Sequence, residues 1–360
     1  MASAPVFMAC AGESGPDGDG AIDRVDVRVE TVAQGADVAG AFTPLVDSFI
    51  ADESGVYWYD GRGAVLARRS DDPEVVELKP PLARTENESR IELVIGMADD
   101  DERLFVGQAF LQTGAVDYFP VPEFEPPGRL LVVPKSGGPA VVVAELDDAT
   151  ITPVASDATR LIVFVQGEAR SGYYQLVRSS LELEPLPLRA PFYSSVRSGD
   201  TLYWSDGEYP PTLLRSRFDD AEPERLGPMA SNTIDAGPGY ALSRQERLLE
   251  PSLDIAQNFV LHDAASGREK PLPGLDETIS LDTALDARHA YWFSYRGESP
   301  TRLPPTNPLL RLARVDVTSG ALTLLNTPGL TSDGGARILG QGRDYLYVQN
   351  GGAILAVEKP

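Results

Sequence analysis

A short aromatic block recurs along the chain and constrains the fold more than any other feature. Residues 55–61 read GVYWYDG, residues 201–207 read TLYWSDG, and a looser copy, AYWFS, begins at Ala290. Weaker apolar versions bring the number of copies to seven. Their anchor residues are Trp58, Val106, Val163, Trp204, Leu242, Trp292 and Val348. The mean spacing of about 48 residues is typical of repeat folds in which each repeat is one small supersecondary unit.

Each copy lies inside a set of four strand-like segments. In the first repeat these are residues 42–51, 55–59, 64–69 and 74–79, separated by turn signals such as Asp60-Gly61. No segment shows sustained apolar spacing of 3.6 residues, so almost no helix is expected. The pattern predicts an all-β fold of four-stranded antiparallel blades, arranged as a seven-bladed β-propeller, with six blades as the alternative.

The blocks Tyr57-Trp58-x-Asp60 and Tyr203-Trp204-x-Asp206 resemble the YWTD-type β-propeller repeat of receptor ectodomains and many bacterial surface proteins. The resemblance extends over roughly residues 40–360. It is specific in two repeats and partial in the repeat of Trp292, and the Thr of the motif is absent. It implies a binding role rather than a reaction. The Tyr and Trp side chains are predicted to pack between blades, and the two Asp residues to form turns.

The first 20 residues differ in character from the rest. An apolar stretch, residues 5–10, ends in Cys10, and a polar tether rich in Gly and Asp follows it. This arrangement resembles the end of a bacterial lipoprotein signal and predicts lipidation of Cys10, membrane attachment and a cell-envelope or extracellular location. The alternative is an ordinary tail with an incidental Cys. Residues 21–360 are predicted to form a single propeller domain.

Composition excludes several classes of function. The chain has 31 Lys+Arg against 54 Asp+Glu, a net charge of −23, and no basic tract, so we expect no nucleic-acid partner. No apolar run approaches the ~20 residues that span a bilayer. A single Cys excludes an intrachain disulfide, and two His residues leave little room for metal or triad chemistry. The sequence favours a non-catalytic monomer with no cofactor and no metal.

Three long predicted loops, residues 108–127, 244–257 and 294–308, fall between second and third strands and therefore on one face of the ring. Long loops on a rigid scaffold are where binding residues concentrate. The alternative is insertions without function. We predict that this face binds a protein, peptide or glycan. The candidate ligand-binding residues are Tyr118, Phe119, Phe124, Arg244, Arg247, Tyr295, Arg296 and Arg302.

The opposite face collects the turns between first and second strands, which are acidic. They contain Asp52, Glu53, Asp99, Asp100, Asp101, Glu102, Asp157, Asp200, Asp286 and Asp344. Such carboxylates either hold a divalent cation or form solvated turns. The enzymatic alternative is a propeller-type hydrolase or lyase whose carboxylates converge at the channel mouth.

The final repeat supplies three strands only, at residues 336–339, 346–349 and 353–358. Near the other end of the chain, residues 25–32 alternate apolar and polar side chains, which is typical of a half-buried strand. We therefore predict that residues 25–32 complete the seventh blade as its outermost strand and close the ring.

Overall fold

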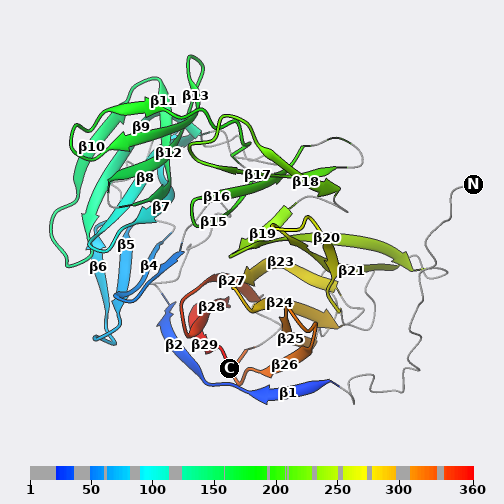
Figure 1. Cartoon of the computed structure of the whole chain (residues 1–360). Helices are drawn as coiled ribbons and strands as arrows, with labels where there is room; N and C mark the ends of the chain where they lie inside the picture. Colours follow the sequence, from blue (N-terminus) through cyan, green and yellow to red (C-terminus); the bar gives the residue numbers. More distant parts are fainter. Residues whose placement is uncertain are drawn as a thin grey trace, which may run out of the picture.

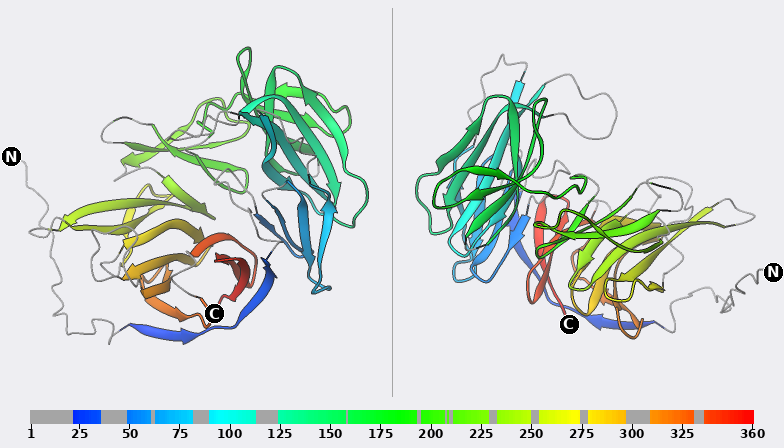
Figure 2. Two further views of the ribbon diagram at one scale, coloured as in Figure 1. Left: turned by 180° about the vertical axis from the view of Figure 1, so that it is seen from behind. Right: turned by 45° about the horizontal axis from the view of Figure 1, so that its top comes forward.

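Seven sheets follow one another around a ring, which confirms the seven-bladed β-propeller (Figures 1 and 2). The structure is a computed structural model. It describes residues 22–35, 49–60, 63–81, 90–112, 124–157, 159–192, 195–206, 208, 211–228, 233–249, 254–273, 278–296, 309–330 and 336–360. These residues contain no α-helix.

Each blade is built on an antiparallel sheet in which consecutive strands pair from the innermost outwards, and the two N-terminal strands join the outer edges of the last two blades. Blade 1 consists of β3 (Phe49–Ala51), β4 (Gly55–Tyr59), β5 (Val65–Arg69) and β6 (Val75–Lys79). Blade 2 consists of β7 (Arg90–Asp99), β8 (Arg103–Gln112), β9 (Phe124–Pro134) and β10 (Val141–Leu146). Blade 3 consists of β11 (Ala149–Ser156), β12 (Arg160–Gly167), β13 (Ser171–Val177) and β14 (Leu183–Pro185). Blade 4 consists of β15 (Val196–Ser198), β16 (Thr201–Ser205), β17 (Thr212–Arg217) and β18 (Glu224–Pro228).

The remaining blades continue the same order. Blade 5 consists of β19 (Thr233–Gly237), β20 (Tyr240–Leu249), β21 (Asp254–Asp263) and β22 (Glu269–Pro271). Blade 6 consists of β23 (Thr278–Leu285), β24 (His289–Arg296), β25 (Leu309–Asp316) and β26 (Leu322–Asn326). Blade 7 begins with β27 (Ala336–Gln341), β28 (Tyr345–Asn350) and β29 (Ala353–Glu358). All seven sequence anchors lie in second strands, as the repeat predicts.

The N-terminal segment closes the ring by joining two blades. Strand β2 (Val29–Gln34) pairs antiparallel with β29, Val29 opposite Val357, and is the fourth strand of blade 7. Strand β1 (Asp23–Asp26) instead pairs parallel with β26 and adds a fifth strand to blade 6. The prediction for residues 25–32 is therefore right for its second half and wrong for its first. Figure 1 shows β1 and β2 running along the outer edges of both blades.

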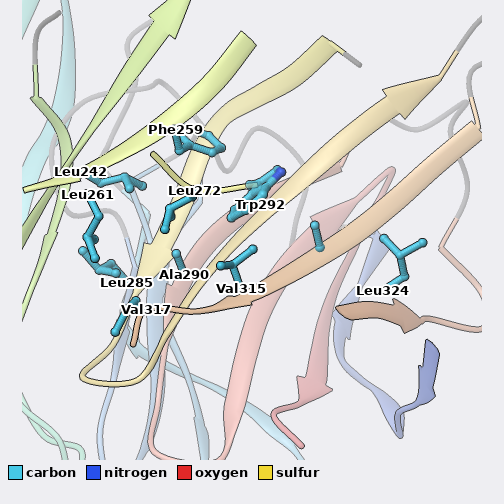
Figure 3. Packing of buried hydrophobic residues seen from close by; sticks show 11 residues of the cluster. Leu242, Phe259, Leu261, Leu272, Leu285, Ala290, Trp292, Val315, Val317 and Leu324 are labelled. Carbon is cyan, nitrogen blue, oxygen red and sulfur yellow. The ribbon is translucent and has the colours of Figure 1, made fainter. Parts of the chain in front are cut away.

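The core is divided into seven apolar clusters, one at each junction between neighbouring blades. The Tyr-Trp pair explains this division, because adjacent strand residues point to opposite faces of a sheet. Tyr57 packs against blade 2 and Trp58 against blade 7. Trp292 of blade 6 meets Phe259 of blade 5, with ring centroids 4.8 Å apart (Figure 3). The predicted packing role of the aromatic block is confirmed.

The Asp residues of the block form turns, also as predicted. Asp60 is 1% exposed, and its Oδ1 accepts a hydrogen bond from the backbone N–H of Ala64 at 2.9 Å. Asp206 accepts from the N–H of Thr212 at 2.9 Å in the same way. Each side chain thus fixes the connection between the second and third strands.

Candidate functional site

The structure corrects the placement of the predicted ligand-binding residues. Tyr118, Phe119, Arg302 and the proposed lipidation site Cys10 lie outside the described residues. The other five lie in strands rather than loops, because the hairpins of blades 2, 5 and 6 extend further than expected. Phe124 begins β9, Arg244 and Arg247 belong to β20, and Tyr295 and Arg296 end β24.

The ring brings only part of this set together. Blades 5 and 6 are neighbours, so Arg244 and Arg247 lie one blade away from Tyr295 and Arg296. Phe124, opposite Leu111 in blade 2, is separated from them by blades 3 and 4 on one side and by blades 7 and 1 on the other. A ligand that touched every predicted position would have to cross the ring.

On the opposite face, the acidic turns are built by their own backbone. The Oδ1 atoms of Asp52, Asp100, Asp157 and Asp286 each accept hydrogen bonds from the backbone N–H groups two and three residues later, at 2.7–3.0 Å. This is turn chemistry. In the part of the chain that the structure describes, no group of three His, Cys, Asp or Glu residues is placed to hold a metal ion.

A buried cation joins blades 1 and 2 at this face. Lys135, directly after β9, is 5% exposed and binds Asp52 of blade 1 and Asp99 of blade 2, the latter at 2.8 Å. Its Nζ lies 5.0 Å from the ring centroid of Tyr57. Burial alone would raise the pKa of Asp52, but hydrogen bonds from Lys135 and Ser54 outweigh it and lower the pKa. Burial lowers the pKa of Lys135, and the two carboxylates more than reverse this.

The same arrangement occurs at two more junctions. Between blades 2 and 3, Arg178 binds Asp100 at 2.6 Å, with its guanidinium carbon 5.2 Å from the Phe105 ring centroid. Between blades 6 and 7, Lys359 binds Asp286 at 3.2 Å and lies 5.9 Å from the Tyr291 ring centroid. We call each unit a cation clamp. It combines an Asp in a first-to-second turn, an aromatic residue five positions later, and a cation directly after the third strand of the next blade.

The sequence contains a signal for the clamps that motif reasoning missed. Asp52 and Tyr57, Asp100 and Phe105, and Asp286 and Tyr291 share one spacing of five residues. Lys135, Arg178 and Lys359 each directly follow a third strand. Aligning the repeats by strand, rather than by the aromatic block alone, would have revealed the three positions together.

Hollows of the surface lie over two of the three clamps. The cleft between blades 1 and 2 has a volume of about 880 Å³, and Tyr57, Arg69, Arg103 and Lys135 are among its lining residues. Between blades 6 and 7, two adjoining hollows of about 440 and 510 Å³ share Arg288, His289 and Pro360. We call this pair of hollows the blade 6–7 cleft.

Cationic side chains outnumber acidic ones in the lining of the blade 6–7 cleft, although the chain as a whole carries a charge of −23. Arg288, Arg314, Arg343 and Lys359 line it together with His289. Burial, and secondarily the nearby Arg314, lower the pKa of His289, so its ring is neutral at neutral pH. Burial would raise the pKa of Asp286, but the N–H groups of Arg288 and His289 and the Lys359 ammonium lower it. The cleft is therefore suited to hold a negatively charged group.

Blade 5 contains a Ser–His–Glu arrangement whose Ser and His side chains are buried. Ser243 Oγ lies 2.7 Å from His262 Nε2, and His262 Nδ1 lies 3.7 Å from Glu269 Oε1. Ser243 is 0% exposed and His262 2% exposed, so no substrate reaches the hydroxyl. Burial lowers the pKa of His262 to about 4, far below the value that suits a general base at neutral pH. This arrangement stabilises the blade and does not perform nucleophilic catalysis.

Comparison with known proteins supports the fold. No protein-family model matches the chain, and no curated protein does. Among solved structures, YCF48 bound to D1 peptide matches with a TM-score of 0.53 and 10% identity, over 94% of this chain and 97% of that one. Oligogalacturonate lyase in complex with manganese matches with a TM-score of 0.50 and 9% identity, over 76% and 77%. TolB from Acinetobacter baumannii matches with a TM-score of 0.37 and 11% identity, over 75% and 80%. At these identities the likeness shows the propeller fold alone.

Proposed function

We propose that this chain is a non-catalytic β-propeller of the cell envelope that binds a protein, peptide or glycan. The observation that carries the proposal is the blade 6–7 cleft, where arginine side chains without ion-pair partners line a hollow on a rigid ring. Arg288 and Arg343 form no ion pair or hydrogen bond through their side chains among the described residues. Exposed, unpaired guanidinium groups are suited to recognition, whereas the one described nucleophile–histidine pair is sealed.

The likeness to solved propellers is compatible with binding. The protein whose structure covers nearly this whole chain was solved with a bound peptide. Tyr118, Phe119, Phe124, Arg244, Arg247, Tyr295, Arg296 and Arg302 remain proposed contacts of a second, opposite face. The relation to the YWTD-type repeat class is likewise part of the proposal.

A binding assay and a turnover assay on the same sample test this proposal. Arrays of peptides and glycans are probed with the full chain, and bound ligands are then incubated with it and analysed by mass spectrometry. We expect saturable binding with the ligand recovered intact. Catalytic turnover of a bound peptide or glycan would contradict the non-catalytic assignment.

A second candidate function is the propeller-type hydrolase or lyase, and one described residue favours it. Asp235 lies on β19, an innermost strand, and burial of its carboxyl group raises its pKa to about 7 despite a 2.9 Å hydrogen bond from Thr283. A carboxyl group with such a pKa is suited to general-acid chemistry. Loss of turnover in Asp235→Asn, with binding retained, would establish this alternative.

Envelope location is also a proposal, and it depends on the Met8-Ala9-Cys10 junction. Among the described residues, no helix is long and apolar enough to cross a bilayer. The proposed attachment is through lipid chains on Cys10, and stable attachment takes more than one chain. We expect Cys10→Ser to move the protein from the membrane fraction to the soluble fraction of fractionated cells. An unchanged distribution would contradict lipidation.

A further inference from the structure

We propose that the blade 6–7 cleft binds an acidic peptide segment, whose carboxylates are held by Arg288 and Arg343. This inference rests on the proposed binding function and specifies its ligand class. It uses a face different from the long-hairpin face that the sequence indicates.

The charge balance of the cleft favours an anion. Four permanent cations line it against the side-chain carboxylates of Asp286 and Asp316 and the last residue, Pro360, and each of these acceptors is already engaged. Asp286 binds Lys359 at 3.2 Å. Asp316 Oδ1 accepts hydrogen bonds from the backbone N–H groups of Thr318 and Ser319 and from the Ser319 hydroxyl at 2.7–3.0 Å. Arg314 donates to an oxygen of the last residue, Pro360, so Arg288 and Arg343 are the two cleft arginines left without a carboxylate partner among the described residues.

Arg314 is already engaged in the free protein. Its Nη1 donates to an oxygen of Pro360, the last residue, while its Nε is buried and has no hydrogen-bond partner. A ligand carboxylate is therefore assigned to Arg288 and Arg343, whose side chains are exposed. The planar guanidinium fork of each matches the two oxygens of a carboxylate.

The shape of the cleft favours a chain segment over a single small anion. The two hollows adjoin at Arg288 and His289, with Arg314 lining the first hollow and Arg343 the second. Pro238 adds apolar surface in the second hollow. An extended peptide with carboxylates at intervals would engage successive arginines while its backbone and aliphatic carbons cover the apolar surface.

The larger cleft between blades 1 and 2 does not have the unpaired arginines that distinguish the blade 6–7 cleft. It also contains cations, but Lys135 is bound to Asp52 and Asp99, and Arg103 to Asp100. Asp71, Asp101 and Glu102 also line that cleft. An acidic peptide would meet unscreened carboxylates there, so the blade 6–7 cleft is the favoured position on a chain that otherwise repels acidic partners.

Fluorescence anisotropy with a labelled hexaglutamate peptide tests the inference on the full chain. The cleft variant is Arg288→Glu/Arg343→Glu. Its matched control is Arg189→Glu/Arg217→Glu, which makes the same change in net charge at exposed arginines outside the cleft. Because both substituted cleft residues are exposed, the cleft variant should melt like wild type, which is checked by thermal unfolding.

We expect wild type to bind hexaglutamate saturably and hexaserine not at all. The cleft variant should bind at least roughly tenfold more weakly, since hydrogen bonds to charged groups are worth about 1.5–3 kcal/mol each. The control pair should stay within about twofold of wild type, apart from the general effect of net charge.

The inference would be overturned if the cleft variant and the control variant lost the same affinity for hexaglutamate. It would also be overturned if wild type did not bind hexaglutamate. Displacement of hexaglutamate by an equimolar amount of inorganic phosphate would assign a small-anion site instead and overturn the peptide assignment. If wild type fails with hexaglutamate but binds other array ligands, this inference fails while the proposed binding function stands. Turnover without stable binding would remove the proposed function itself.

Discussion

Two junctions of the ring use the same three repeat positions but different interactions. They are the junction between blades 1 and 2 and the junction between blades 4 and 5. In the first, Asp52, Tyr57 and Lys135 form a buried cation clamp. In the second, the equivalent residues are Ser198, Tyr203 and Ala264, within a smaller cluster completed by Leu213, Ala236 and Ala241. The buried neutral pair Ser243–His262 lies on the same face of blade 5 as Ala241, by strand alternation.

The comparison extends around the ring. Wherever the turn Asp and the aromatic residue are both present, a cation follows the next blade's third strand. At the other four junctions that position is occupied by Phe218, Ala264, Val317 or Ser70. Leaving a buried charge without its partner is strongly destabilising, so the three positions have to change together. A fold with one repeat geometry thus tolerates different residues at each junction, provided that every buried charge has its partner within that junction.

The largest effect is expected from deleting residues 22–35, which carry β1 and β2. The deletion removes the fourth strand of blade 7 and the fifth of blade 6, and leaves β29 and β26 as open edges. We expect a loss of stability greater than that of any single substitution below, measured by thermal unfolding. A chain that lacks only residues 1–20 is the control. Identical melting of the two truncated chains would show that β1 and β2 do not stabilise the ring, and that the apolar cluster and the Lys359 clamp suffice between blades 6 and 7.

The next effect concerns two junctions without a clamp. Trp58 is 0% exposed at the junction of blades 7 and 1, and Trp204 is 5% exposed at that of blades 3 and 4. Trp58→Ala and Trp204→Ala should each lower the free energy of unfolding by ~3–5 kcal/mol. Chemical denaturation measures the loss. Wild-type stability in either variant would mean that apolar packing does not carry these junctions.

The clamp is tested by Lys135→Met, which leaves the partly exposed carboxylates of Asp52 and Asp99 beside each other without a cation. We expect a loss of roughly 1–3 kcal/mol in the free energy of unfolding, because both carboxylates lose their charged hydrogen-bond donor. The triple variant Lys135→Met/Asp52→Asn/Asp99→Asn should recover much of it, since no charge remains. A triple variant as unstable as the single one would show that the clamp stabilises by more than charge compensation.

The junction of blades 4 and 5 should respond to acid instead. The unfolded chain protonates its histidine near pH 6.5, whereas burial lowers the pKa of His262 to about 4 in the folded protein. The neutral histidine's contribution is therefore present above pH 6.5, falls as pH drops from 6.5 towards 4, and is lost below. The loss amounts to at most roughly 3 kcal/mol. Denaturation at several pH values should show a flatter slope in His262→Gln; equal slopes would contradict a neutral buried ring.

The smallest effect is expected at an exposed ion pair. Arg160 of blade 3 binds Asp219 of blade 4 at 2.6 Å, but the Asp219 side chain is 62% exposed. Arg160→Gln should change the free energy of unfolding by ~0–1 kcal/mol, less still in high salt. A loss as large as that of Lys135→Met would remove the distinction between buried and exposed pairs.

Much of the fold could be predicted because its signals are local. Strand length, turn residues and the Tyr-Trp block predict the boundaries of second strands such as β4 and β16 to within one residue. The ring closure was predictable only in part, because the alternation of residues 25–32 does not indicate where the strand changes partner near Val27. The long hairpins were mistaken for loops, since the strand ends of Arg247 and Arg296 carry polar residues that also suit loops.

The candidate site was not predictable in the same way. Arg288, Arg314 and Arg343 are far apart in the sequence and belong to no motif, so nothing local distinguishes them from other surface arginines. The sequence by itself determined the repeat, the seven second strands and the Asp turns of the aromatic block, because backbone propensity and strand alternation act over a few residues. Only the tertiary structure decided which charges meet across a junction and which arginines are left unpaired in a cleft. Electrostatic pairing depends on distances between different blades, and those distances exist only once the ring has closed.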